Sequence, residues 1–182
     1  MRTNQKMLTT GLLEDSWKYE INPFHDRKIN DKKAEWLANF PFSFFITLTY
    51  RKAVTGEQKV YEDLRKLYRF TSQKVFGRNA FDAFPKENSI SFYAVMEEHA
   101  SGALHVHMLL EDISRNNAYA RDSFVHLPDV IFSKWKKIAG NPTELDMKAL
   151  VDYKLRLQYA DYCVKKLGAK GTRDEFRFMH PK

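Results

Sequence analysis

Two histidines, His105 and His107, stand one residue apart inside the apolar run ALHVHMLLE (103–111). The run predicts a β-strand, because it is apolar and follows a short polar turn. Side chains at i and i+2 of a strand share a face, so both imidazoles point to one side while Val106 points to the other. Neutral imidazole is the commonest metal ligand in proteins, so such a pair indicates a divalent-metal site. The alternative is two ordinary surface histidines, because a chain of 182 residues with six histidines often contains this spacing by chance.

A glutamate in the preceding segment is placed to join the two histidines. SISFYAVME (89–97) predicts a second strand, and the tight turn after it contains Gly102, so the two strands form a hairpin. A hairpin brings the end of its first strand beside the start of its second, which places Glu97 close to His105. Two imidazoles and a carboxylate with open coordination positions suit Mn²⁺ or Mg²⁺ that also binds phosphate oxygens and water. Two neighbours compete with Glu97 as the third ligand, namely Glu98 and His99.

A tyrosine on a helix near the C-terminus is the candidate nucleophile. Residues 153–167 predict a helix whose apolar stripe consists of Leu157, Ala160, Cys163, Val164 and Leu167. Tyr162 lies on the opposite side, with Lys165 one turn further along. A phenol beside an ammonium suits attack on phosphorus, because the positive charge stabilises both the phenolate and the attacked phosphate. Tyr159, one turn earlier, is the rival nucleophile, and a plain surface tyrosine is the alternative.

The rest of the chain predicts the elements that must position these residues. SFFITLTY (43–50) predicts a strand with Phe45, Thr47 and Thr49 on one face. The other predicted elements are a short helix over 31–40, helices over 57–76 and 129–139, and a short strand over 145–151. This order of strands and helices implies an antiparallel sheet covered by helices, an α+β fold.

The composition favours a soluble, basic protein with a polyanionic partner. The chain has 30 Lys and Arg against 23 Asp and Glu, which gives a formal net charge of +7. No apolar run approaches the roughly 20 residues of a membrane span, and the N-terminus lacks the apolar stretch of a signal peptide, so we expect a cytoplasmic protein with no membrane partner. The single cysteine, Cys163, excludes an intramolecular disulfide framework and a Cys-rich zinc site.

In this order, the motifs resemble those of the HUH endonucleases, and specifically of the rolling-circle replication initiators (Rep proteins) of bacterial plasmids and phages. The first motif is the strand FFITLTY (44–50), and the second is Glu97, then Gly102, then His105-Val106-His107. The third is Tyr162-Cys163-Val164-Lys165 on a helix, and the segment FSKW (132–135) resembles the helix between the second and third motifs. The resemblance spans residues 43 to about 170. Many bacterial relatives have a tyrosine directly after the third-motif lysine, where this chain has Lys166.

The resemblance implies a reaction and a role for each residue. The protein would nick and rejoin single-stranded DNA, or origin hairpin DNA, through a covalent 5′-phosphotyrosine. Glu97, His105 and His107 would bind the metal, Tyr162 would attack phosphorus, and Lys165 would stabilise the charge. Some Reps use two helical tyrosines, which leaves a role for Tyr159 open. A partner helicase and a polymerase are implied, because no helicase segment follows the third motif.

The resemblance also implies the architecture and the DNA contacts. The fold would be RRM-like or ferredoxin-like, in a single domain over residues 1–182 with an N-terminal extension (1–40) and a catalytic core (43–170). The expected DNA-binding residues are Thr47, Thr49, Tyr50, Arg51, Lys52 and Lys166. Further basic clusters suit phosphates or form a solvated charged face, namely Lys134, Lys136, Lys137, Lys170, Arg173 and Arg177.

Three other functions compete with the initiator. A single-tyrosine transposase and a relaxase share the same kind of site. A transposase of that type is usually a compact dimer, and relaxases tend to have a third metal-binding histidine in place of Glu97. A non-catalytic RRM-like nucleic-acid-binding module is the third alternative. It predicts no metal-dependent cleavage and exposed aromatic side chains on the central strands.

Overall fold

The computed structural model describes residues 26–78, 90–111, 126–142, 145–165 and 172–178, with the backbone alone for 26–29 and 172–178. The described elements are α1 (Asp26–Ala38), β1 (Phe42–Leu48), α2 (Glu57–Phe76), β2 (Phe92–Glu98), β3 (Leu104–Glu111), α3 (Leu127–Ala139), β4 (Leu145–Ala149), α4 (Tyr153–Lys165) and β5 (Thr172–Phe178). No described helix is both long and apolar enough to cross a membrane.

The strands form one five-stranded sheet in the order β4-β1-β3-β2-β5, and each pair of neighbours is antiparallel. From β1 to β4 the chain follows the β-α-β-β-α-β order of ferredoxin-like folds. The predicted α+β, RRM-like architecture is therefore confirmed. The central strand of this sheet is β3, so the histidine pair lies at the middle of the sheet.

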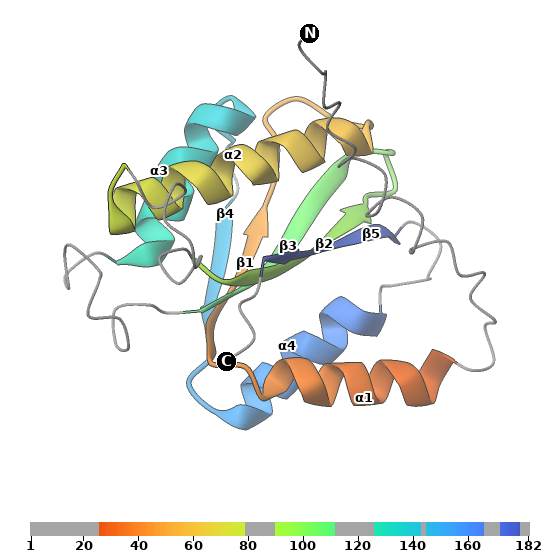
Figure 1. The fold of residues 1–182 in the computed structure, drawn as a ribbon. Helices are drawn as coiled ribbons and strands as arrows, with labels where there is room; N and C mark the ends of the chain where they lie inside the picture. The colour runs from red at the N-terminus through yellow and green to blue at the C-terminus, as the bar shows by residue number, and fades with distance from the viewer. Residues whose placement is uncertain (1–25, 79–89, 112–125, 143–144, 166–171, 179–182) are drawn as a thin grey trace, which may run out of the picture.

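Helices cover both faces of the sheet (Figure 1). The helices α2 and α3 lie on one face, and α1 and α4 lie on the other. The alternation predicted for 43–50 holds, because Ile46 and Leu48 pack with α2 and α3 while Phe45 packs with α1 and α4. Phe42 joins Phe45 on the same face because the register shifts between Phe42 and Phe44.

The helix α4 is fixed at its start and along its buried face. Asp152 precedes it, and the Asp152 Oδ1 atom accepts a hydrogen bond of 2.8 Å from the backbone nitrogen of Leu155, as an N-cap residue does. The Arg156 Nε atom donates a bond of 3.1 Å to the carbonyl oxygen of Ala38 at the end of α1. Buried side chains join the two helices, namely Ala34, Leu37, Ala38, Ala160, Cys163 and Val164. These contacts hold α4 against the sheet and make α1 part of the packed fold, although it falls within the predicted N-terminal extension.

The helix α3 is fixed to the end of β1. Pro128 lies in its first turn, and Gly140 ends it in the left-handed conformation at φ 79°, which glycine adopts without strain. The buried Trp135 Nε1 atom donates a bond of 2.7 Å to the carbonyl oxygen of Thr49. This contact holds α3 over the point where β1 leaves the sheet.

Three element boundaries differ from the prediction. The helix α1 begins at Asp26 rather than at residue 31, and β4 ends at Ala149 rather than at residue 151. The segment predicted as a tail contains β5, which pairs with the edge strand β2. Its sequence, TRDEFRF, has too many charges to stand out as a strand.

Candidate metal centre

The hairpin of β2 and β3 brings the predicted ligands together by its register. Glu97 lies directly opposite His105, and Val95 lies opposite His107. On the other side of β3, Thr47 of β1 lies opposite His107. All of these side chains belong to the face covered by α1 and α4, so the predicted sharing of one face by the two histidines is confirmed.

The three side chains present their donor atoms to one another. The Nε2 atoms of His105 and His107 are 3.0 Å apart, and the Glu97 Oε2 atom lies 2.9 Å from the His107 Nε2 atom and 3.5 Å from the His105 Nε2 atom. All three donor atoms lie within 4.8 Å of one another, so the group can hold a metal ion. We call Glu97, His105 and His107 the EHH cluster.

Tyr162 reaches the EHH cluster from α4. Its hydroxyl donates a hydrogen bond of 3.3 Å to the Glu97 Oε2 atom and lies 3.5 Å from the His107 Nε2 atom. Its ring makes edge-to-face contacts with His107 at 5.1 Å and with Phe45 at 5.9 Å between centroids. The side of α4 opposite the Ala160 stripe therefore carries a phenol at the cluster. Tyr162 is 39 % exposed, so its hydroxyl is both at the cluster and within reach of a substrate from solvent.

Two residues of β1 orient the His107 ring. The Thr47 Oγ1 atom lies 3.2 Å from the His107 Nδ1 atom, and the Phe45 ring stacks on the imidazole at 5.4 Å and 13°. When Nδ1 carries the proton and donates it to Thr47, the Nε2 lone pair is free for a metal. The side chain predicted to contact DNA at residue 47 thus touches a metal-ligand candidate instead.

Comparison with known proteins identifies the family. A model of the replication-associated protein ORF2 family matches residues 43–168, more than two thirds of the chain. The chain belongs to this family. The matched region of this replication-associated protein runs from β1 past α4, so it contains the EHH cluster and Tyr162, whereas α1 and β5 lie outside it. No curated protein and no solved structure matches the chain.

The alternative ligands and the other catalytic candidates lie apart from the cluster's donor atoms. His99 is exposed in the hairpin turn, where its Nδ1 atom lies 3.3 Å from the Ser101 Oγ atom, and Glu98 lies outside the metal-binding group. The Tyr159 ring stacks on Phe45 at 4.5 Å and packs against the core. The Lys165 ammonium forms an ion pair with Asp161 on the same helix.

The other predicted DNA-binding residues leave the sheet at the end of β1. The Arg51 backbone nitrogen donates a bond of 3.2 Å to the carbonyl oxygen of Ala139, and Arg51 and Lys52 are exposed. The Tyr50 ring packs edge-on against Trp135 at 5.0 Å, and burial, with the Asp63 carboxylate as a second cause, raises the pKa of Tyr50. Lys166 and Lys170 lie outside the described residues, as do the side chains of Arg173 and Arg177.

We predict that Thr47→Val lowers the affinity of this replication-associated protein for Mn²⁺. Valine keeps the shape of threonine but cannot bond to the His107 Nδ1 atom, so the ring loses the partner that fixes its tautomer. Loss of such a partner typically weakens a metal site about 10- to 100-fold. Isothermal titration with Mn²⁺ measures the change, with Thr47→Ser as the control that restores the hydroxyl. Equal Mn²⁺ affinities of wild type and Thr47→Val would show that Thr47 does not orient the ligand.

We predict that Cys163 resists alkylation in the folded protein. Its side chain is fully buried in α4, and this burial, followed by the negative charge of Glu97, raises the pKa of the thiol. The thiolate is the reactive form, so iodoacetamide at pH 8 should leave folded Cys163 unmodified and modify it rapidly in guanidinium chloride. Mass spectrometry of the two reactions checks this, and rapid modification of the folded protein would contradict the packing of α4 on the sheet.

Proposed function

We propose that this replication-associated protein is a replication initiator endonuclease that nicks and rejoins single-stranded DNA at an origin. The carrying observation is the Tyr162 hydroxyl, which lies 3.3 Å from the carboxylate of a Glu-His-His cluster on a sheet. A nucleophile poised beside a candidate metal site is the arrangement that phosphoryl transfer to tyrosine needs. Family membership supports the initiator role over a transposase or a relaxase.

The donor atoms of the EHH cluster fit a divalent metal. Two imidazole Nε2 atoms 3.0 Å apart and a carboxylate oxygen converge without a lysine or arginine among them. Two imidazoles make the set softer than the all-oxygen sets that Mg²⁺ prefers, which favours Mn²⁺ of the two predicted ions. When bound, the ion would act as a Lewis acid on the scissile phosphate.

The protein's own side chains supply the nucleophile and its orientation. Glu97 accepts the hydrogen bond of the Tyr162 hydroxyl and so holds the phenolic oxygen at the cluster. In the nicking step the phenol loses its proton, and the oxygen forms a bond to phosphorus while the bond to the 3′ oxygen breaks. The 3′ oxygen takes up a proton, which leaves a 5′-phosphotyrosine and a free 3′-OH that a polymerase can extend.

The covalent intermediate allows the strand to be rejoined without ATP. A later 3′-OH attacks the phosphotyrosine, a new bond to the 3′ oxygen forms, and Tyr162 leaves with a proton. Lys165 is placed one turn along α4, where its charge can offset that of the attacked phosphate once Asp161 releases it. Because the Tyr159 ring packs on Phe45, we assign the first attack to Tyr162 alone.

The test is a search for the adduct itself. A labelled library of single-stranded oligonucleotides is incubated with the protein and Mn²⁺, and the products are separated on a denaturing gel. We expect a labelled band at the mass of the protein plus DNA that is absent with EDTA, and sequencing of the trapped strand gives the origin. Binding without any adduct, on any sequence, would favour the non-catalytic binding module instead.

A further inference from the structure

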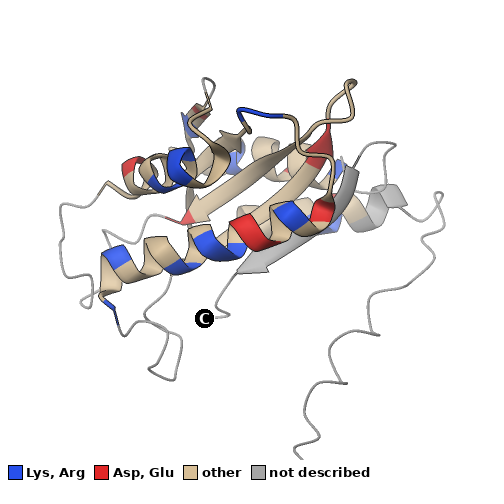
Figure 2. Cartoon of the chain, turned by 90° about the horizontal axis from the view of Figure 1, so that it is seen from above, with Lys and Arg blue, Asp and Glu red and all other residues tan. Residues whose placement is uncertain are grey.

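The outer surface of the α2 and α3 layer carries a concentration of positive charge. Residues 65–78 contain five Lys or Arg and no Asp or Glu, and residues 130–140 contain three Lys and no Asp or Glu. Figure 2 looks down on this layer and shows blue bands along the C-terminal half of α2, with its red bands toward the N-terminal end. The eight cations are Arg65, Lys66, Arg69, Lys74, Arg78, Lys134, Lys136 and Lys137. We call this group the α2–α3 basic surface.

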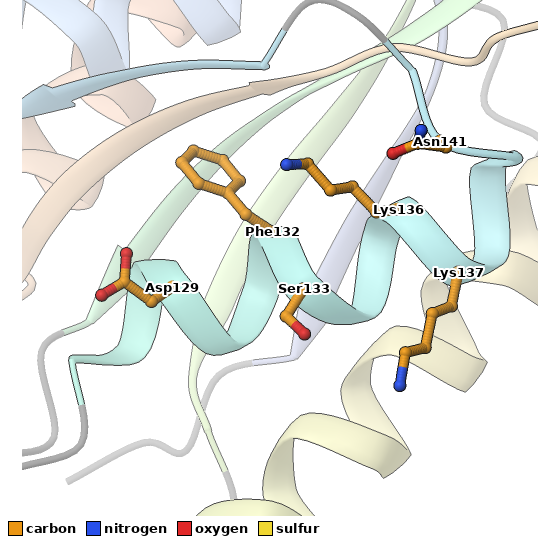
Figure 3. A pocket seen from close by; sticks show the side chains of 6 residues that line it. All are labelled: Asp129, Phe132, Ser133, Lys136, Lys137 and Asn141. Carbon is orange, nitrogen blue, oxygen red and sulfur yellow. The ribbon is translucent and has the colours of Figure 1, made fainter.

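The two helices meet at an exposed aromatic ring. Phe70 of α2 is 42 % exposed, and the Lys134 Nζ atom of α3 lies over its ring at 5.9 Å from the centroid. Lys137 points from α3 toward α2, whereas Lys136 lies on the other flank of the helix beside Phe132 (Figure 3). Cations therefore line both sides of α3.

A shallow hollow of about 570 Å³ lies against α3. It is lined by Asp129, Phe132, Ser133, Lys136, Lys137 and Asn141. Its single acid stands at the start of the helix, and the two lysines stand near the end. The hollow gives room beside the lysines for a phosphate and its sugar.

The basic surface continues to the sheet end that carries the EHH cluster. The Arg51 backbone bonds to Ala139 at the end of α3, and Arg51 and Lys52 are both exposed. These two residues follow β1, in which Thr47 lies opposite His107. A line of cations thus leads from the α2–α3 layer, around the end of β1, toward the catalytic face.

We propose that the α2–α3 basic surface binds the phosphate backbone of duplex DNA, while the opposite face acts on a single strand. The sheet separates the two surfaces, since Ile46 and Leu48 face α2 and α3 whereas Phe45 faces α4. A nucleic acid bound here is therefore a different segment from the strand at Tyr162. The choice of DNA as the polyanion rests on the proposed replication function; the binding itself does not require cleavage.

The shape and composition of the surface favour a duplex over a single strand. The 20 residues of α2 span about 30 Å, close to the roughly 34 Å of one turn of B-DNA. Single-strand surfaces rely on aromatic side chains on which bases stack. Among the described residues of α2 and α3, Phe70 is the exposed aromatic, and Lys134 already covers its ring.

The test removes three charges from the surface and, for comparison, three from elsewhere. The test variant is Arg69→Gln/Lys134→Gln/Lys137→Gln. The matched control is Lys32→Gln/Lys148→Gln/Lys154→Gln, which removes the same charge from exposed positions on α1, β4 and α4. Circular dichroism and thermal melting verify that both variants fold.

Fluorescence anisotropy then measures binding to a labelled duplex of about 20 base pairs of arbitrary sequence, over a range of salt concentrations. We expect the test variant to bind about 10- to 100-fold more weakly than the control, with the slope of log K against log[salt] less steep by roughly 2 to 3. Adduct formation on short single-stranded oligonucleotides should be the same for both variants.

Each other outcome overturns the proposal. Equal duplex affinities for test and control variants would show that the surface does not hold DNA. Equal losses on duplex and single strand would make it part of the single-strand path. No duplex binding by the wild type would leave an acidic protein as the partner. Because this assay contains neither metal nor cleavage, its result is independent of whether Tyr162 forms an adduct.

Discussion

Replacing Tyr162 with phenylalanine will abolish the covalent protein–DNA adduct and leave the fold intact. The substitution removes only the hydroxyl, so the ring keeps its contacts with Phe45 and His107. Removing a nucleophile leaves no atom to form the bond to phosphorus, and we expect adduct formation to fall at least about 1,000-fold. The measurement is the labelled band on a denaturing gel under single-turnover conditions, with binding of the oligonucleotide measured separately and expected to be unchanged.

The matched control is Tyr159→Phe, which removes a hydroxyl from the same helix one turn earlier. The Tyr159 ring stacks on Phe45 and packs against the core, so the adduct should form at the wild-type rate. An adduct that survives Tyr162→Phe and disappears with Tyr159→Phe would assign the attack to the other tyrosine. Loss of the adduct in only the double variant would show that the two can replace each other.

The ligand positions could be predicted because short-range rules fix them. Alternation along 103–111 decides which face His105 and His107 share, and a tight turn decides which residue of β2 stands opposite. The observed pair of Glu97 and His105 follows from these two rules alone. The side of the helix on which Tyr162 lies followed from helical spacing in the same way.

The contacts that the sequence did not show depend on tertiary packing. The bond between Thr47 and His107 joins residues 60 positions apart, and it exists because β1 happens to pair with β3 in that register. The ring of Tyr50, predicted to stack on bases, lies against Trp135 because α3 folds back over the end of β1. Likewise β5 is a strand because the edge of β2 accepts it, although its own residues carry little strand signal.

Replacing Glu97 with glutamine will remove most of the metal affinity, whereas replacing its neighbour Glu98 will not. Glutamine keeps the size of glutamate and an oxygen that can accept the Tyr162 hydrogen bond, but it lacks the charge that attracts a divalent ion. We expect Mn²⁺ affinity to fall by about 100-fold or more in Glu97→Gln and to stay at the wild-type value in Glu98→Gln. Calorimetric titration with Mn²⁺ separates the two, and a larger loss in Glu98→Gln would exchange their roles.

The histidines provide the second half of this test, because the same hairpin contains a histidine outside the cluster. His107→Gln should lose both Mn²⁺ binding and the adduct, whereas His99→Gln should keep both, since His99 is exposed and bonds to Ser101 in the turn. If excess Mn²⁺ restores the adduct in Glu97→Gln but not in Tyr162→Phe, metal binding and nucleophilic attack are separate functions of the site. An adduct that forms in His107→Gln at the wild-type rate in the presence of EDTA would instead mean that Tyr162 reacts without the EHH cluster.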